Sequence, residues 1–126
     1  MSVSEPTMIG VAEATHAKLQ RLKEDGHFRE MADAYRFGIG LALAQGVVPK
    51  EISSRTVFSV ATIDPQQELR TAIQAVFGSQ LEGVAVYKMA ERLADWGINE
   101  LSALAEKGEI DLVGLFDQIE AAKAQQ

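Results

Sequence analysis

Two histidines, each three residues from a glutamate, are the side chains that could most readily do chemistry together. Glu13 precedes His16, and Glu30 follows His27. Residues three apart share a face of a helix, and Glu-x-x-His pairs that point inward from facing helices can bind metal ions in a bundle. His16, however, lies off the apolar stripe of its segment, and His27 falls in a turn beside Gly26. We therefore expect two solvated histidines and no metal site.

No other motif predicts an active site or a cofactor. The segment Gly38-Ile39-Gly40 lacks the Gly-Lys-Ser/Thr ending of a phosphate-binding loop and its strand-to-helix context. No serine is bracketed by glycines as in the nucleophile elbow of hydrolases. The chain contains no cysteine, which excludes disulfides, thiolate metal sites and cysteine nucleophiles. We expect a non-enzymatic protein that uses no cofactor.

The net charge of the chain and its distribution indicate which kind of partner the protein can bind. The chain of 126 residues has 18 acidic and 12 basic side chains, a net charge of -6, which argues against a protein that coats nucleic acid by charge alone. Residues 1–50 are balanced, and residues 51–126 carry the whole excess. Basic side chains cluster in the balanced half at Lys18, Arg21, Lys23 and Arg29. These are our candidate contacts to nucleic-acid phosphates, and the alternative is an ordinary solvated face.

The sequence predicts a cytoplasmic protein that does not enter a membrane. The N-terminal residues lack the basic patch and apolar core of a secretory signal. The longest apolar run, Phe37 to Val48, is shorter than the ~20 residues that span a bilayer. The absence of cysteine suits a reducing compartment.

The spacing of apolar residues and the positions of helix start and stop residues predict one mainly α-helical domain over residues 1–126. We expect five or six short helices and one or two short strands. Residues 7–46 contain a pair of helices, and residues 64–122 form an acidic helical part. The first helix is predicted over about residues 8–24. Its beginning, residues 7–11, could equally be an extended ribbon, because β-branched residues alternate there and a glycine disfavours helix.

A strand is predicted over Thr56–Ile63, where β-branched and aromatic residues are concentrated. A lone strand leaves its backbone groups unpaired, so this segment needs a partner. The partner is either the extended N-terminal segment or the same strand from another copy of the chain.

Helix start and stop signals divide the C-terminal half. Asp64, followed by proline, is typical of a helix start. A further helix is expected from about Val84 to Trp96, ending at Gly97, and Asn99 could cap a short helix after it. Asp111 opens the last helix.

The segment Phe28–Gln45 is apolar on two faces, so both must be buried. Another copy of the chain would cover the second face economically, and we expect an oligomer with this helix at its interface. Small residues at Gly38, Gly40, Ala42 and Ala44 would permit close approach between helices. The candidate interface residues are Phe28, Met31, Tyr35, Phe37, Ile39, Leu41 and Leu43.

Residues 7–46, TMIGVAEATHAKLQRLKEDGHFREMADAYRFGIGLALAQG, resemble the ribbon-helix-helix pattern of bacterial DNA-binding regulators. A short extended segment precedes a helix with Leu19 and Leu22, a turn at Gly26 and a longer apolar helix. The resemblance implies that ribbons of two chains pair and enter the major groove, and that Arg29 contacts a phosphate. The ribbon offers no Arg, Lys, Asn or Gln to base edges. The helix pair is also similar to one in the small helical subunit of bacterial DNA phosphorothioation systems.

Two functions from different classes follow. The first is a non-enzymatic DNA-associated regulator or accessory subunit of a bacterial DNA-handling system, which touches phosphates through the basic cluster. The alternative is an oligomeric adaptor or assembly protein without nucleic-acid binding, whose strand and acidic helices dock another protein. The helix pair and the basic cluster favour the first function, whereas the acidic total favours the second.

Overall fold

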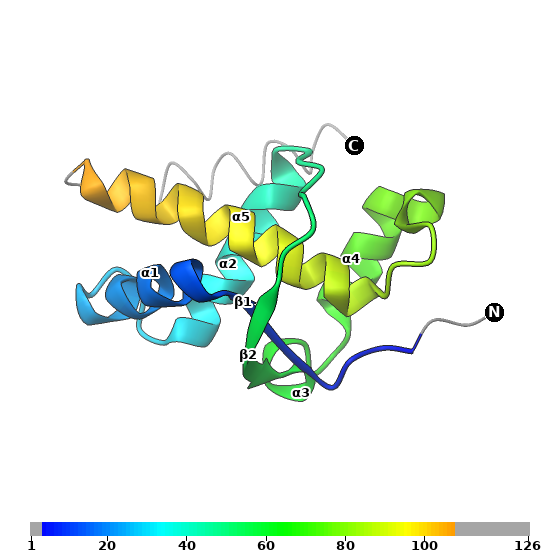
Figure 1. The fold of residues 1–126 in the computed structure, drawn as a ribbon, viewed down its shortest axis with the longest axis horizontal. Coiled ribbons are helices and arrows are strands. Elements are labelled where there is room, and N and C mark those ends of the chain that lie inside the picture. Colours follow the sequence, from blue (N-terminus) through cyan, green and yellow to red (C-terminus); the bar gives the residue numbers. More distant parts are fainter. Residues whose placement is uncertain (1–3, 108–126) are drawn as a thin grey trace.

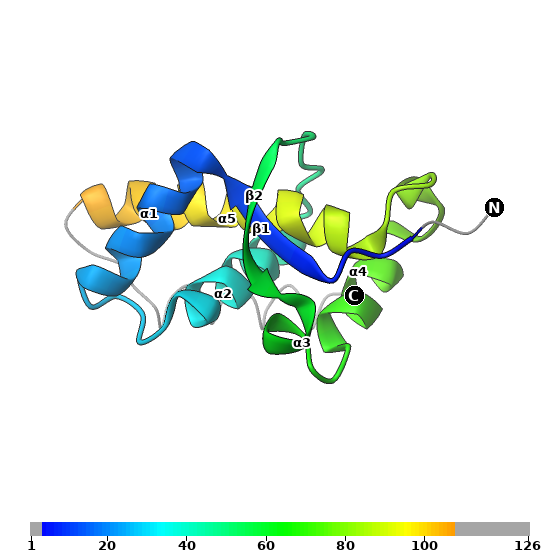
Figure 2. The same ribbon diagram turned by 60° about the horizontal axis from the view of Figure 1, so that its bottom comes forward.

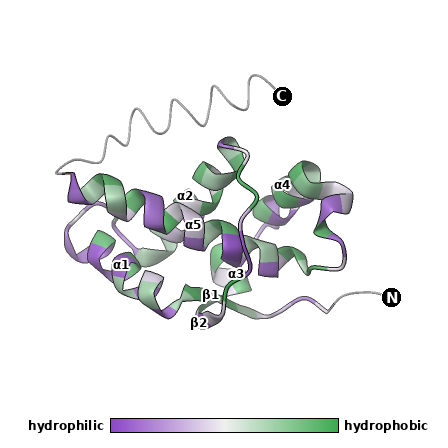
Figure 3. Ribbon diagram, turned by 45° about the horizontal axis from the view of Figure 1, so that its top comes forward, coloured by the Kyte–Doolittle hydropathy of each residue, from purple (hydrophilic) through white to green (hydrophobic). Residues whose placement is uncertain are grey.

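The longest helix, α5 (Val86–Glu106), is the element on which the rest of the fold is assembled. Figure 1 shows it running through the middle of the computed structural model, which describes residues 4–107. Helices α1 (Glu13–Glu24), α2 (Met31–Ala44) and α4 (Glu68–Phe77) pack against it, together with strand β1 (Met8–Ala12). Hydrophobic and hydrophilic residues alternate along α5 (Figure 3), as expected for a helix that is buried on one side.

The remaining elements are short. Strand β2 (Ser54–Ser59) is followed directly by α3 (Val60–Ile63), and a 3-10 helix, η1 (Gly78–Leu81), continues from α4. Residues 4–107 thus contain five α-helices and two antiparallel strands, and the predicted mainly α-helical class is confirmed. No helix in this part of the chain is long and apolar enough to cross a membrane.

The N-terminal residues form the extended ribbon and not the start of a helix. Residues 8–12 are strand β1, and α1 begins only at Glu13. Strand β1 pairs antiparallel with β2, with Ile9 opposite Phe58 and Ala12 opposite Ser54. Of the two partners considered for the predicted strand, the structure therefore shows the N-terminal segment of the same chain. Figure 2 shows the two strands lying across α5.

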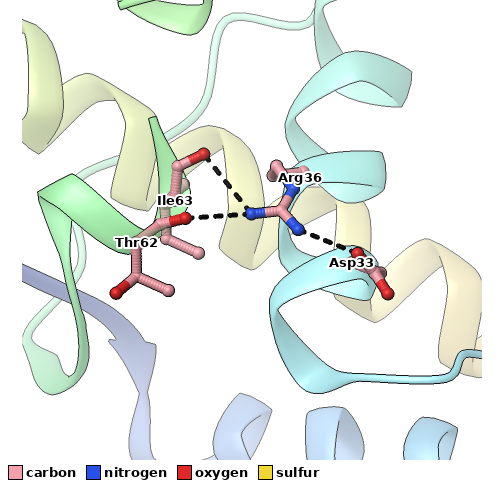
Figure 4. A network of polar contacts seen from close by, with 4 residues as sticks. All are labelled: Asp33, Arg36, Thr62 and Ile63. Carbon is pink, nitrogen blue, oxygen red and sulfur yellow. Dashed lines mark hydrogen bonds and ion pairs between the residues drawn. The ribbon is translucent and has the colours of Figure 1, made fainter. Parts of the chain in front are cut away.

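The predicted strand over Thr56–Ile63 is too long. It ends at Ser59, whose hydroxyl accepts a hydrogen bond from the Thr62 amide (3.2 Å) and caps the short helix α3. Hydrogen bonds also join α3 to α2. The Arg36 guanidinium on α2 donates to the Thr62 carbonyl (3.1 Å) and forms an ion pair with Asp33 (2.8 Å), as Figure 4 shows. Local capping thus outweighs the β propensity of residues 60–63.

Two predicted helix boundaries are wrong. Helix α4 begins at Glu68 and not just after Asp64, because Gln67 has a left-handed backbone (φ 59°). Helix α5 does not stop at Gly97, and Asn99 lies inside it and caps no helix. The physical reason is a close crossing: a Cβ added at Gly97 would overlap the carbonyl oxygen of Gly38 on α2. The helix predicted to open at Asp111 lies outside the described residues.

The same crossing explains how α2 is buried. The small residue at Gly38 does permit a close helix approach, but the neighbour is α5 of the same chain. Three of the candidate interface residues, Tyr35, Ile39 and Leu41, are fully buried in the chain's own core, so the need for a second copy to cover them was wrong. The other four are half-buried against that core: Phe28, Met31, Phe37 and Leu43. Oligomerisation through these four residues stays a prediction.

Candidate functional site

The histidines do not form a metal centre. His16 is only 8% exposed, so the expectation that it is solvated was wrong; α1 packs against both α5 and α2, which widens its buried face beyond the leucine stripe. His27 is half-buried in the turn after α1. The neighbouring glutamates are paired elsewhere, Glu13 with Arg55 (2.9 Å) and Glu30 with Lys23 (3.7 Å). Within residues 4–107 no three acidic or histidine side chains come together as metal ligands would.

The structure brings together two of the four candidate phosphate-binding residues. Lys18 and Arg21 line one hollow between α1 and α5. Lys23 lies about 140° around the helix from Lys18, from the ordinary geometry of an α-helix, and its ammonium faces Glu30. Arg29 is exposed in the loop that joins α1 to α2. The four side chains therefore do not form one basic surface.

The hollow between α1 and α5 has a volume of about 280 Å³ and a mixed lining. Its apolar part comes from Ala14, Ala17 and Leu22 on α1 and from Ala105 on α5. Its charged part consists of two cations and two anions: Lys18, Arg21, Asp25 and Glu106. Lys18 is held in place because its ammonium donates to the side-chain oxygen of Asn99 (2.6 Å).

Strand β1 is sealed on the edge that faces away from β2. The Gly10 amide donates to the Glu91 carboxylate (2.9 Å), and the Ala12 amide donates to Asp95 (3.0 Å). The Tyr35 hydroxyl donates to the Gly10 carbonyl (2.8 Å). Residues four apart on a helix are about 6 Å apart, and residues two apart on a strand nearly 7 Å, so two α5 carboxylates can match two strand amides.

This sealed edge includes a deeply buried carboxylate and a buried phenol. Glu91 is 2% exposed and pairs with Lys88 (3.1 Å). Burial, followed by the charges of Glu91 and Asp95, raises the pKa of Tyr35 well above its usual value. The phenol therefore stays protonated and keeps donating to Gly10. This arrangement holds β1 in place, and Ile9 and Val11 on the strand are fully buried.

Hydrogen bonds between the N-terminal segment and α5 continue on both sides of β1. The Glu5 carboxylate accepts hydrogen bonds from the Val86 and Tyr87 amides (2.9 and 3.0 Å) at the beginning of the helix. Further along, the Asn99 amide group donates to the Thr15 hydroxyl (3.0 Å). Sequence reasoning missed these contacts, because their partners are more than eighty residues apart in the sequence. The only signal was the spacing of Glu91, Asp95 and Asn99, which places them on one face.

A smaller hollow of about 120 Å³ lies beside the single tryptophan. Trp96 is half-buried and lines this hollow with Pro49 and Ile52 from the loop before β2. Lys50 and Arg92 are also part of the lining. Asn99 lines this hollow, and its side-chain oxygen accepts the hydrogen bond from Lys18 of the larger one.

The chain matches no protein-family model, and no curated protein or solved structure is significantly similar to it. The resemblance of residues 7–46 to ribbon-helix-helix regulators therefore stays a prediction. The geometry differs from what that resemblance implies at one point: strand β1 pairs with β2 of its own chain.

Proposed function

We propose that the protein is a non-enzymatic interaction module that binds a protein partner through the hollow between α1 and α5. The observation that carries the proposal is the lining of this hollow, which combines alanine side chains with Lys18, Arg21, Asp25 and Glu106. Protein–protein interfaces usually combine apolar and charged side chains in this way. The function corresponds to the adaptor or assembly protein of the sequence-based alternatives.

The charge of the lining supports a protein partner over a nucleic acid. The two cations and two anions sum to zero, whereas binding to a phosphate backbone requires an excess of cations. Strand β1 supports the same choice. Ile9 and Val11 face the core, so the opposite face of the strand has only positions Met8, Gly10 and Ala12, none of which offers a side chain that hydrogen-bonds to base edges.

A DNA-associated regulator or accessory subunit is the second candidate function. It is favoured by the basic side chains of this region. Lys18 and Arg21 lie close enough to line the same hollow, and Arg29 is exposed in the loop that follows α1. In this case the contacts would be to phosphates and would weaken steeply with salt.

For either function we place the protein in the cytoplasm, because a chain without cysteine suits a reducing compartment.

Site-specific photo-crosslinking tests the protein-binding proposal. A photoreactive amino acid replaces Ala17 in the hollow and, as a matched control, exposed Thr71 on α4. We expect a discrete crosslinked protein from position 17 only, which disappears when Arg21→Glu is added. Identical products from both positions, or a product that Arg21→Glu leaves unchanged, would contradict the proposal.

A salt titration with a fluorescent DNA duplex tests the second candidate on the same protein. Anisotropy that rises with protein, falls steeply with salt and is reduced by Lys18→Ala with Arg21→Ala would support phosphate contacts. Arg70→Ala on α4 is the matched control, since Arg70 is not part of the hollow. Absence of binding at low salt would remove the DNA-associated function and leave the protein-binding module.

A further inference from the structure

Helices α2 and α5 present apolar side chains on the side that faces away from the sheet. Tyr35 and Asp95 both form hydrogen bonds to β1. Phe37 follows Tyr35 by two residues and so lies about 200° around α2 from it. Leu104 follows Asp95 by nine residues and so lies about 180° around α5 from it. Phe37 and Leu104 therefore point away from β1, and both are only half-buried.

Phe28 extends this apolar surface toward the end of α5. Its ring centre lies 5.7 Å from that of Phe37. Its amide donates to the Leu22 carbonyl (3.3 Å), and Leu22 lines the hollow between α1 and α5 together with Ala105. The two rings thus lie near the last turn of α5. We call the surface formed by Phe28, Phe37 and Leu104 the rear apolar face.

The chain continues beyond the described residues with a segment that has an apolar stripe of its own. Residues 108–126 follow directly after the end of α5, and a helix is predicted to open at Asp111. Its apolar residues recur at helical spacing: Leu112, Leu115, Phe116 and Ile119. A helix with one apolar stripe buries that stripe against another surface.

We propose that residues 111–122 fold back as a helix whose apolar stripe covers the rear apolar face of the same chain. The place of attachment supports this occupant. Residues 107–110 are then the connection, and packed helices are commonly joined by about two to eight residues. A helix over residues 111–122 is about 18 Å long, whereas Leu104 lies about 10 Å along α5 from the crossing with α2 at Gly97. The segment therefore begins beside the rear apolar face and is long enough to cross it.

A segment of the same chain also has an advantage over a second copy. A short connection holds it close to the rear apolar face at a high effective concentration, so the contact does not depend on how concentrated the protein is. Phe28 and Phe37, two of the predicted oligomer contacts, are then covered within one chain. The rear apolar face is separate from the hollow between α1 and α5, because Phe28, Phe37 and Leu104 do not line that hollow.

Thiol labelling of single-cysteine variants of the full chain tests the proposal, because the chain has no cysteine of its own. Ile119→Cys places the thiol on the apolar stripe, and Asp117→Cys, about 200° around the predicted helix, places it on the opposite side. We expect Ile119→Cys to react about ten-fold or more slowly than Asp117→Cys in native buffer, because a packed thiol reacts only when the contact opens. In urea the two rates should be equal.

Substitution of the rear apolar face shows where the stripe packs. Phe28→Glu should raise the labelling rate of Ile119→Cys by about ten-fold, because a charge on this face opposes burial of the stripe. Leu104→Glu is a second variant with the same expected effect, and circular dichroism checks that each variant is folded. Val76→Glu on α4 is the control, since Val76 is an exposed apolar residue (40%) outside this face, and it should leave the rate unchanged.

Three outcomes would overturn the proposal. Ile119→Cys that reacts as fast as Asp117→Cys would show that the stripe is not buried. Protection that both Phe28→Glu and Leu104→Glu leave unchanged would show that the stripe packs on another surface. Protection that disappears on dilution would show that a second copy of the chain supplies the contact.

Discussion

At Gly97 the backbone of α5 touches the backbone of α2, and no side chain fits between them. A Gly97→Ala variant must push the two helices apart, because the added Cβ would overlap the Gly38 carbonyl oxygen. We expect the free energy of unfolding to fall by about 1–3 kcal/mol, the usual cost of overpacking. Urea denaturation measures this loss.

Gly40 is the control for this prediction, because it lies on α2 two residues from Gly38. Among residues 4–107 nothing lies within 4 Å of a Cβ added at Gly40. Alanine is the better helix former by about 1 kcal/mol, so Gly40→Ala should preserve or raise stability. Equal losses from the two substitutions would mean that the helix crossing is not the reason.

The two tyrosines predict how stability depends on alkaline pH. Burial, followed by the hydrogen bond to Asp64 (2.9 Å) and the charge of that carboxylate, raises the pKa of Tyr87 from 10.0 to about 12. A raised pKa means that the folded state holds the proton more tightly than the unfolded state does. The contribution of Tyr87 to the free energy of unfolding should therefore be fully present below pH 10 and be lost as pH rises toward about 12.

Ultraviolet absorbance measures this effect directly, because the chain has only two tyrosines and the pKa of Tyr35 is raised as well. We expect no tyrosinate near pH 10 in the folded protein and normal ionisation in urea. Tyr87→Phe should make the alkaline loss of stability smaller. Ionisation of one tyrosine near pH 10 in the folded protein would contradict the assigned hydrogen bonds.

Among the elements, α4 depends on one carboxylate outside it. Asp64 accepts hydrogen bonds from the Leu69 and Arg70 amides (3.0 Å each) and from the Tyr87 hydroxyl. Asp64→Ala removes all three hydrogen bonds, and we expect a loss of about 1–3 kcal/mol. Hydrogen exchange should increase most at the first amides of α4.

Asp64→Asn is the graded variant, because asparagine keeps one acceptor oxygen and replaces the other with an amide donor. The Leu69 and Arg70 amides donate to different oxygens of Asp64, so Asp64→Asn should lose less stability than Asp64→Ala, and hydrogen exchange should speed up at only one of these two amides. Equal acceleration at both amides in Asp64→Asn would contradict the assigned hydrogen bonds.

The elements also show which features a sequence can predict. Apolar periodicity located α1 and α2, and β-branched residues located the start of β2, because these are local patterns. Gly97 was interpreted as a helix stop because its reason for being glycine lies on another helix, at Gly38. The acceptors Glu91 and Asp95 were missed for the same reason: their partner amides are more than eighty residues away in sequence.

The candidate site was predictable in part. Lys18 and Arg21 are three apart on a helix, so their common face follows from the sequence. That Asp25 and Glu106 neutralise the same hollow does not, because Glu106 is brought there by the packing of α5 on α1. The balance of charge that favours a protein partner is therefore a tertiary property.

For the molecule as a whole, α5 connects the beginning of the described chain to its end. Glu5, Gly10, Ala12 and Thr15 each bond to α5, in the same order along both segments. Helices α2 and α4 pack on the same element. Residues 7–46 and the part that begins at residue 64 therefore share one core and should not unfold separately.

Two probes of unfolding can test whether the two parts of the chain unfold together. Fluorescence of Trp96 reports on the packing of this side chain between α5 and the loop before β2, whereas far-ultraviolet circular dichroism reports on all helices. Because every large element packs on α5, we expect the same urea midpoint and the same slope from both probes. Glu91→Ala, which unseals the edge of β1, should lower both midpoints together. A variant in which circular dichroism decreases while Trp96 fluorescence persists would instead show that α5 and α4 fold without the N-terminal helix pair.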